Sequence, residues 1–166
     1  AVIDGLNPSV WLELRTLRGI CGREYGIGML SDISQRIELY TKIIRIAPGE
    51  RVPRHRLISS LIDRGELEQA AVAIKSAEDF VHFDSVISRY KVKLTIQQAQ
   101  TTEGIMLEDR VAKLREAERL ALSGLSRLRD DKYAYMAYAD VGVALAYMNG
   151  DLSVLNSALL RMEEAM

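Results

Sequence analysis

Two stretches of this 166-residue chain share one pattern: LIDRGELEQAAVAIKSAE from Leu61 to Glu78, and AYMNGDLSVLNSALLRMEE from Ala146 to Glu164. In both stretches an apolar helix end reaches a glycine, an acidic residue and a leucine follow, and a second amphipathic helix begins. The pattern predicts a helical hairpin that is used at least twice. Because a single hairpin cannot bury its apolar face, repeated hairpins stack into solenoids, and these usually present a surface to a partner.

Apolar residues recur at helical spacing along the rest of the chain. They predict about eight helices in four antiparallel pairs, and no segment shows the period-two alternation of a half-buried strand, so the expected fold class is all-α. Gly65 and Gly150 are 85 residues apart (150 minus 65), and the fifth and sixth helices between them are therefore expected to be long. The residues expected to cap a helix or to stand in its first turn are Asn7, Pro8, Ser31, Pro53, Asp84, Asp130 or Asp131, and Asp151.

The composition excludes several classes of protein. With 48% hydrophobic and 27% charged residues, residues 1–166 are expected to form a single domain. A formal net charge of -1 argues against general binding to nucleic acid or anionic lipid. One cysteine and two histidines build neither a disulfide framework nor a standard zinc site, so we expect no metal and no cofactor. No segment has the length and apolarity of a membrane span, and we expect a cytoplasmic chain that is part of a larger protein, because it opens on Ala1.

The stretch from Ile37 to Glu78 resembles a tetratricopeptide repeat, a helix-turn-helix unit of about 34 residues. Tyr40 supplies the aromatic residue and Pro48 the repeat end, while Gly65, Ala70 and Ala77 match the turn glycine and the two small packing residues. The resemblance is weaker over Tyr133–Glu164. There Leu155 and Met162 stand in place of the two alanines, and the last two helices are expected to pack less closely.

The resemblance implies a right-handed array of helical hairpins whose concave face is lined by the first helix of each pair. Such a face binds a peptide, a helix or a partner protein, and a mixed lining with Arg, His and Tyr suits an extended peptide with a carboxylate group. The alternative is that these positions are ordinary packing and surface residues. The residues that this register places in the groove are Arg18, Cys21 and Tyr25 on the first helix, His55, Ser59 and Ile62 on the third, and Asp140, Ala144 and Tyr147 on the seventh.

Two basic regions stand out. Arg45, Arg51, Arg54 and Arg56 surround one turn and form a candidate basic patch for phosphate or an acidic partner, with a solvated turn as the alternative. The sixth helix carries six basic residues, Arg110 and Arg115 among them, interleaved with acids, which predicts a charged solvent face. Neither region has aromatic residues for base stacking, so nucleic-acid binding is not expected.

The seventh helix, KYAYMAYADVGVALAYMNG, is rich in alanine and has Gly142 near its middle. Small side chains let another helix approach closely. Core packing explains this surface, and self-association as a homo-dimer through the C-terminal helices is the alternative, because no polar capping helix follows.

No catalytic constellation is recognisable: the histidines lie in different hairpins, and GREYGIG from Gly22 to Gly28 lacks the order of a nucleotide-binding loop. We therefore expect a non-catalytic scaffold, adaptor or regulatory domain that binds a peptide or partner protein through a concave helical surface. Two alternatives stay open. One is a small-molecule-sensing regulatory domain, which a closed cavity lined by Tyr and Arg would favour, and the other is a homo-oligomerisation module.

Overall fold

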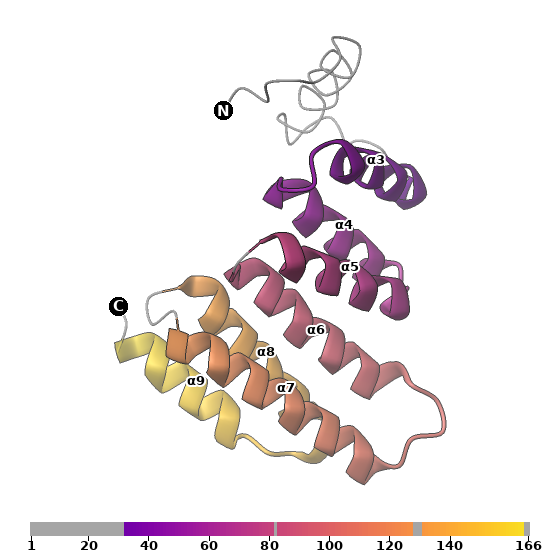
Figure 1. Cartoon of the computed structure of the whole chain (residues 1–166). Helices are drawn as coiled ribbons and strands as arrows, with labels where there is room; N and C mark the ends of the chain where they lie inside the picture. Colours follow the sequence, from indigo (N-terminus) through magenta and orange to yellow (C-terminus); the bar gives the residue numbers. More distant parts are fainter. Residues whose placement is uncertain (1–31, 82, 128–130, 165–166) are drawn as a thin grey trace. The chain divides into compact units, whose positions relative to one another are not determined.

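The computed structural model describes residues 32–81, 83–127 and 131–164. Within these ranges every regular element is an α-helix, and seven helices are present (Figure 1). The all-α prediction is confirmed. The first expected helix, with Asn7 and Pro8, lies outside the described residues. We expected a single domain, and the structure groups the chain into two compact units, of which the first ends at Glu66 and the second begins at Leu67. Each unit is described by itself.

The described part of the first unit is a pair of helices, α3 (Ile33–Ile46) and α4 (Arg51–Asp63). Asp32 caps α3, because its carboxylate accepts a hydrogen bond of 2.8 Å from the backbone N–H of Ser34. Tyr40 and Ile43 of α3 are buried and pack against Leu57 of α4. The cap thus lies one residue after the expected Ser31, which is itself outside the described residues.

The second unit contains α5 (Leu67–Phe80), α6 (Ser85–Thr101), α7 (Leu107–Arg127), α8 (Lys132–Asn149) and α9 (Ser153–Glu164). Two predicted starts are confirmed, at Asp84 and Asp131, whereas Asp151 lies two residues before the first residue of α9. Asp84 accepts hydrogen bonds from the backbone N–H groups of Val86 and Ile87, and Asp131 caps α8, while Asp130 lies outside the described residues. Asp151 accepts a 2.9 Å hydrogen bond from the Ser153 N–H at the start of α9. Helix α7, with 21 residues, is longer than both of its neighbours, as expected, whereas α6, with 17 residues, is longer than α5 but shorter than α7 and α8.

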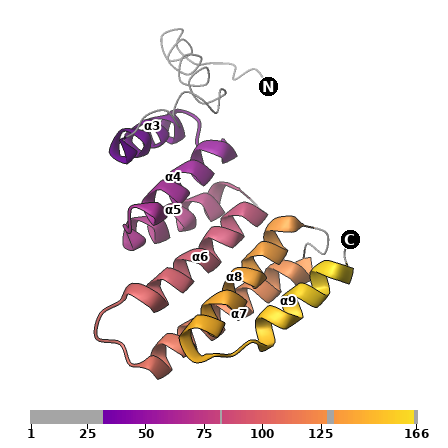
Figure 2. The same ribbon diagram turned by 180° about the vertical axis from the view of Figure 1, so that it is seen from behind.

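The core of the second unit lies between α6, α7, α8 and α9. Helix α6 contacts both α7 and α8, and α8 also contacts α7 and α9. In Figure 1 α7 lies in front of α8, and in the reverse view of Figure 2 α8 lies in front of α7, so these two helices occupy different layers. Leu114, Val141 and Leu145 are fully buried at their interface. Alanines at 117, 121, 137 and 144 fill the remaining core and keep the helices close.

The expectation that α8 and α9 pack less closely than other helices is wrong. A Cβ atom added to Gly142 of α8 would lie 2.7 Å from both the Cα and the backbone N of Leu155 on α9. No side chain fits in that space, so the backbones of the two helices are in contact here. The small residue that allows the approach stands on α8, whereas the repeat pattern places it on the second helix.

Arg110 does not lie on the predicted solvent face of α7. Its guanidinium donates hydrogen bonds to the backbone carbonyls of Ala99, Gln100 and Thr102, at 2.6 to 2.9 Å, and to that of Ile105 at 3.3 Å. These carbonyls lie at the end of α6 and in the following turn, where no intrahelical partner is available to them. Arg110 therefore ties α7 to the end of α6.

Arg115 also makes a contact outside its own helix. It pairs with Glu118 one turn along α7 and with Asp151 in the α8–α9 turn. Hydrogen bonds from Ser153, by side chain and backbone, together with the Arg115 guanidinium, lower the pKa of Asp151 to about 2. The α8–α9 turn is thus attached to α7 through one carboxylate.

Candidate functional site

Helix α8 presents a row of exposed side chains along one face. Met136, Asp140, Val143 and Tyr147 follow one another at spacings of four, three and four, which places them on the same side of the helix. The opposite side carries the buried Val141 and Leu145. Tyr147 is 89% exposed, the largest exposed fraction among the large hydrophobic residues of the described ranges. A helix that is buried on one side would normally carry polar residues on the other.

An ion pair joins this row to α6. The Nη2 and Nε atoms of Arg89 lie 3.1 and 3.3 Å from the same Asp140 oxygen, and both side chains are partly exposed. The pair neutralises both charges at the surface between the two helices. We call the surface formed by Arg89, Met136, Asp140 and Tyr147 the α6–α8 face. It is an apolar face with one polar, charge-balanced group in it.

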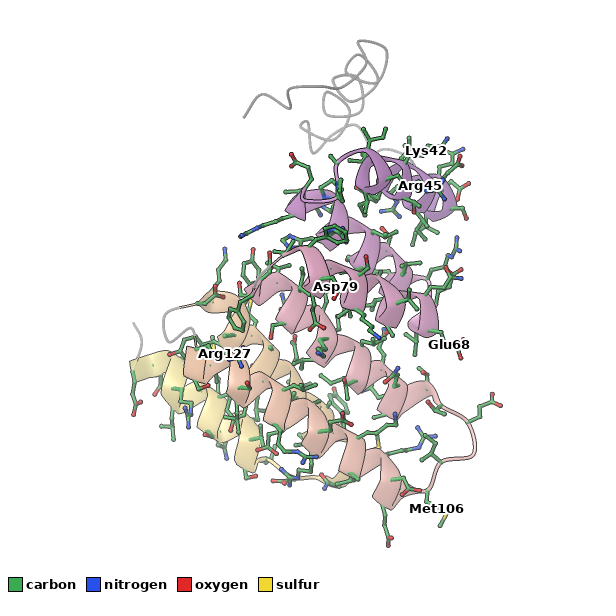
Figure 3. The ribbon with its side chains drawn as sticks, viewed as in Figure 1. Lys42, Arg45, Glu68, Asp79, Met106 and Arg127 are labelled. Atoms are coloured by element: carbon green, nitrogen blue, oxygen red, sulfur yellow. The ribbon has the colours of Figure 1, made fainter. Side chains whose placement is uncertain are left out.

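A small pocket adjoins Arg89 at the end of the unit where α6 and α8 begin. Small residues of α7 and α8 contribute to its lining, and so does Phe83, whose ring centroid lies 5.1 Å from the guanidinium carbon of Arg127. Arg127 is labelled on α7 in Figure 3. Phe83 has a left-handed backbone with a φ of 42°, a conformation that costs a non-glycine residue roughly 1–2 kcal/mol. The lining residues are Phe83, Ser85, Ser88, Arg89, Ala121, Gly124, Ala134 and Ala137.

The pocket differs from the cavity that a small-molecule sensor was expected to have. Its lining contains Arg89 and a phenylalanine but no tyrosine. Its polar lining residues are Ser85, Ser88 and Arg89, and its other lining residues are Phe83 and small residues of α7 and α8.

The predicted groove residues fall into three groups. In the first unit Ile62 is only 1% exposed and is a core residue, because its side of α4 is covered. His55 and Ser59 are half-buried, and the Ser59 hydroxyl lies 3.4 Å from the Asp63 carboxylate. In the second unit Asp140 and Tyr147 lie on the α6–α8 face, whereas Ala144 is buried in the core. Arg18, Cys21 and Tyr25 lie outside the described residues.

The predicted basic patch is smaller than expected. Arg54 is 3% exposed, and its Nε donates a 2.7 Å hydrogen bond to the carbonyl of Pro48, so it holds the α3–α4 turn together. Arg45, Arg51 and Arg56 are exposed, and Figure 3 labels Arg45 on α3. Removing Arg54 from the patch leaves three exposed arginines, each an ordinary surface position.

Sequence reasoning missed Arg89 and Phe83. The sequence did contain a signal for the Arg89–Asp140 pair. Arg89 stands on the fifth expected helix and the oppositely charged Asp140 on the seventh. The first helices of successive hairpins are neighbours in a stack, so the two side chains could have been expected to meet. The sequence contains no such signal for the left-handed backbone of Phe83, because that conformation depends on the turn in which the residue lies.

Within residues 32–81, 83–127 and 131–164 no group of three His, Cys, Asp or Glu side chains is arranged to hold a metal ion. In the same ranges no helix combines the length and the hydrophobicity needed to cross a bilayer. No family model matches the chain, and no curated protein matches its sequence.

Proposed function

We propose that this chain is a non-catalytic, tetratricopeptide-like interaction module that binds a peptide or a partner protein through the α6–α8 face. The observation that carries the proposal is the exposed row on α8, in which Met136 and Tyr147 flank a charge-balanced Arg89–Asp140 pair. Aromatic residues, methionine and arginine are the residue types enriched in protein interfaces.

The contacts between helices support the repeat-like part of the proposal. In a stack of hairpins each first helix packs against its own partner and against the first helix of the next hairpin. In the second unit α6 contacts α7 and also α8, and α8 contacts α9. This is the order that two stacked hairpins, α6–α7 and α8–α9, would produce, with α6 and α8 side by side on one face.

The chemistry of the face indicates what it would bind. An extended segment or helix with apolar side chains would cover Met136 and Tyr147, and its polar backbone or a polar side chain would meet the Arg89–Asp140 pair. Because that pair is already neutral, the partner needs no large net charge. We therefore expect binding whose strength depends weakly on salt concentration.

Selection of peptides from a random displayed library tests the proposal without knowledge of the natural partner. Peptides selected on the wild-type chain should bind Tyr147→Ala at least about tenfold more weakly, the loss expected for truncation of a central aromatic residue. Val72→Ala is the matched control, because Val72 is also highly exposed (70%) but lies on α5, outside the α6–α8 face.

Two results would contradict the proposal. One is the absence of any enriched peptide. The other is a set of peptides whose affinity is the same for the wild type and for Tyr147→Ala, which would place the binding surface elsewhere.

A further inference from the structure

The last turn of α8 ends in an Asn–Gly pair. Asn149 is the final residue of the helix, and Gly150, in the left-handed conformation, follows as its C-cap. Both residues are exposed. Gly150 has no side chain, and no atom beyond its two chain neighbours lies within 4 Å of the position where a Cβ would stand. The backbone nitrogen of Gly150 is therefore not shielded by a side chain, and water has access to the pair.

The side chain of Asn149 is folded back over the turn. Its Oδ1 atom accepts a hydrogen bond of 3.1 Å from the backbone N–H of Asp151. The ring that this bond closes contains the backbone nitrogen of Gly150, so the side-chain amide is turned toward the following residue. A donor at Oδ1 also draws electron density away from the Cγ atom and stabilises negative charge that develops on the oxygen.

We propose that Asn149 is a site of spontaneous deamidation in the folded chain. The backbone nitrogen of Gly150 loses its proton to a hydroxide ion and attacks Cγ of Asn149, while the Asp151 N–H stabilises the oxyanion that forms on Oδ1. The bond between Cγ and the side-chain nitrogen breaks, ammonia leaves with a proton from water, and a cyclic succinimide remains. Water then adds to one carbonyl carbon of the succinimide and opens the ring to aspartate or isoaspartate. In the net reaction asparagine and water give an acidic residue and ammonia.

One hydrogen bond opposes the reaction. The Gly150 N–H donates to the Ala146 carbonyl at 3.0 Å, and the nitrogen can attack only when this bond opens. The bond closes the last turn of α8, and the ends of helices open more easily than their interiors. The reaction therefore requires the opening of one terminal hydrogen bond and not the unfolding of the unit.

Asn156 provides a comparison within the same chain. It is exposed like Asn149, but it lies inside α9, which runs from Ser153 to Glu164. The residue after it is Ser157, whose side chain hinders the approach of the backbone nitrogen and whose N–H lies within the continuous helix. Asn156 thus lacks both the glycine neighbour and the helix end that Asn149 has.

The chain has one further asparagine, Asn7, which lies outside the described residues. Pro8 follows it in the sequence, and a proline nitrogen carries no hydrogen in the chain and is not available for the attack. Asn149 is therefore the asparagine that we expect to react first.

Incubation of the folded wild-type chain at mildly alkaline pH tests the proposal. Anion exchange should show an acidic form that grows with time, because conversion of one neutral amide into a carboxylate changes the formal net charge from -1 to -2. Peptide mapping by mass spectrometry should place the change at Asn149, with conversion at Asn156 at least about tenfold slower. A sample taken at time zero corrects for conversion during the digestion.

Asn149→Gln is the matched control. It keeps a side-chain amide, but the longer side chain would have to close a larger ring, which forms far more slowly, so the acidic form should be absent over the same period. A synthetic peptide with the sequence of residues 147–153 checks the conditions, because no helix holds its Asn–Gly pair, and it should react.

This inference goes beyond the proposed function, because it involves neither the α6–α8 face nor a partner. A folded chain that stays unmodified while the peptide reacts would overturn it, since the hydrogen bond to Ala146 would then protect Gly150. An acidic form that persists in Asn149→Gln would also overturn it, because the reaction would lie elsewhere. Equal rates at Asn149 and Asn156, or no reaction in either the chain or the peptide, would have the same meaning.

Discussion

The two stretches that share a sequence pattern, 61–78 and 146–164, form the same turn, but only the second stretch lies within one compact unit. Gly65 and Gly150 both adopt the left-handed conformation, with φ values of 79° and 76°. In the second stretch both helices belong to one unit, whereas the first stretch crosses the boundary between Glu66 and Leu67. The local sequence therefore determines the turn, and residues outside the pattern determine what the helices pack against.

The acidic residue after each glycine shows the same difference. Glu66 pairs with Arg64, two residues away. Asp151 accepts a hydrogen bond from the backbone N–H of Ser153 at the start of α9 and also pairs with Arg115 on α7, 36 residues away in the sequence. One carboxylate stabilises a turn, and the other connects a turn to a neighbouring helix.

The largest expected effect on stability comes from a substitution at Gly142. This residue lies on α8, the helix in which the second stretch begins, and it has no place in the repeat pattern. Gly142→Ala should reduce the free energy of unfolding by about 3 kcal/mol, because the new Cβ would overlap the backbone of Leu155. Chemical denaturation measures the change.

Gly124→Ala is the matched control for this prediction. Gly124 is also a helical glycine, but a Cβ there would meet the Ser88 Oγ at an ordinary 3.6 Å. This substitution should be neutral or should stabilise the chain by about 0.5–1 kcal/mol, the difference in helix propensity. Equal destabilisation by both variants would show that α8 and α9 are not in backbone contact at Gly142.

The two turn glycines should respond alike, because their backbones are alike. Gly65→Ala and Gly150→Ala should each cost about 1 kcal/mol, since alanine disfavours a positive φ and no atom lies within 4 Å of either new Cβ. Thermal unfolding of the two variants measures both costs. A large difference between them would mean that tertiary packing, and not local conformation, decides the requirement for glycine.

Asp151→Asn should destabilise the chain at neutral pH, and the effect should depend on pH. The folded pKa of Asp151, about 2, lies below its ordinary value of 3.8. Its contribution is therefore fully present above about pH 4 and is lost as the pH falls through about 2. The difference in unfolding free energy between the wild type and Asp151→Asn should shrink over this range, and a difference that stays constant would exclude the proposed ionic contact.

Glu66→Gln should have the smallest effect. The Arg64–Glu66 pair joins two partly exposed neighbours on one turn, and such pairs contribute between 0 and about 1 kcal/mol. We expect a change within about 0.5 kcal/mol by chemical denaturation. A loss as large as that in Asp151→Asn would remove the distinction between the two turns.

The sequence was sufficient to predict the features that depend on nearby residues. The caps at Asp84 and Asp131, the Asp151 contact with the Ser153 N–H and the glycine turns follow from short-range hydrogen bonds and φ angles. Tyr147 was predicted to line a partner-binding groove; its side chain is exposed, and its role in binding stays a prediction. These features need no knowledge of how the helices pack.

The features that were missed depend on neighbours far along the chain. Ile62 was assigned to a groove and is buried, because the exposed side of a helix is fixed by what covers it. Arg54 and Arg110 read as surface charges, yet each donates to backbone carbonyls of the preceding helix end or turn. A long arginine side chain reaches such carbonyls only when two helices meet at a particular angle, which the sequence pattern does not specify.

The central claim is that the α6–α8 face of the second unit binds a partner. Photo-crosslinking tests it most directly, with a photoreactive amino acid placed at position 147 or, as a control, at position 72, in extracts of the source cells. We predict that position 147 gives a discrete adduct with another protein and that position 72 does not. The same adducts from both positions, or none from position 147, would contradict the claim.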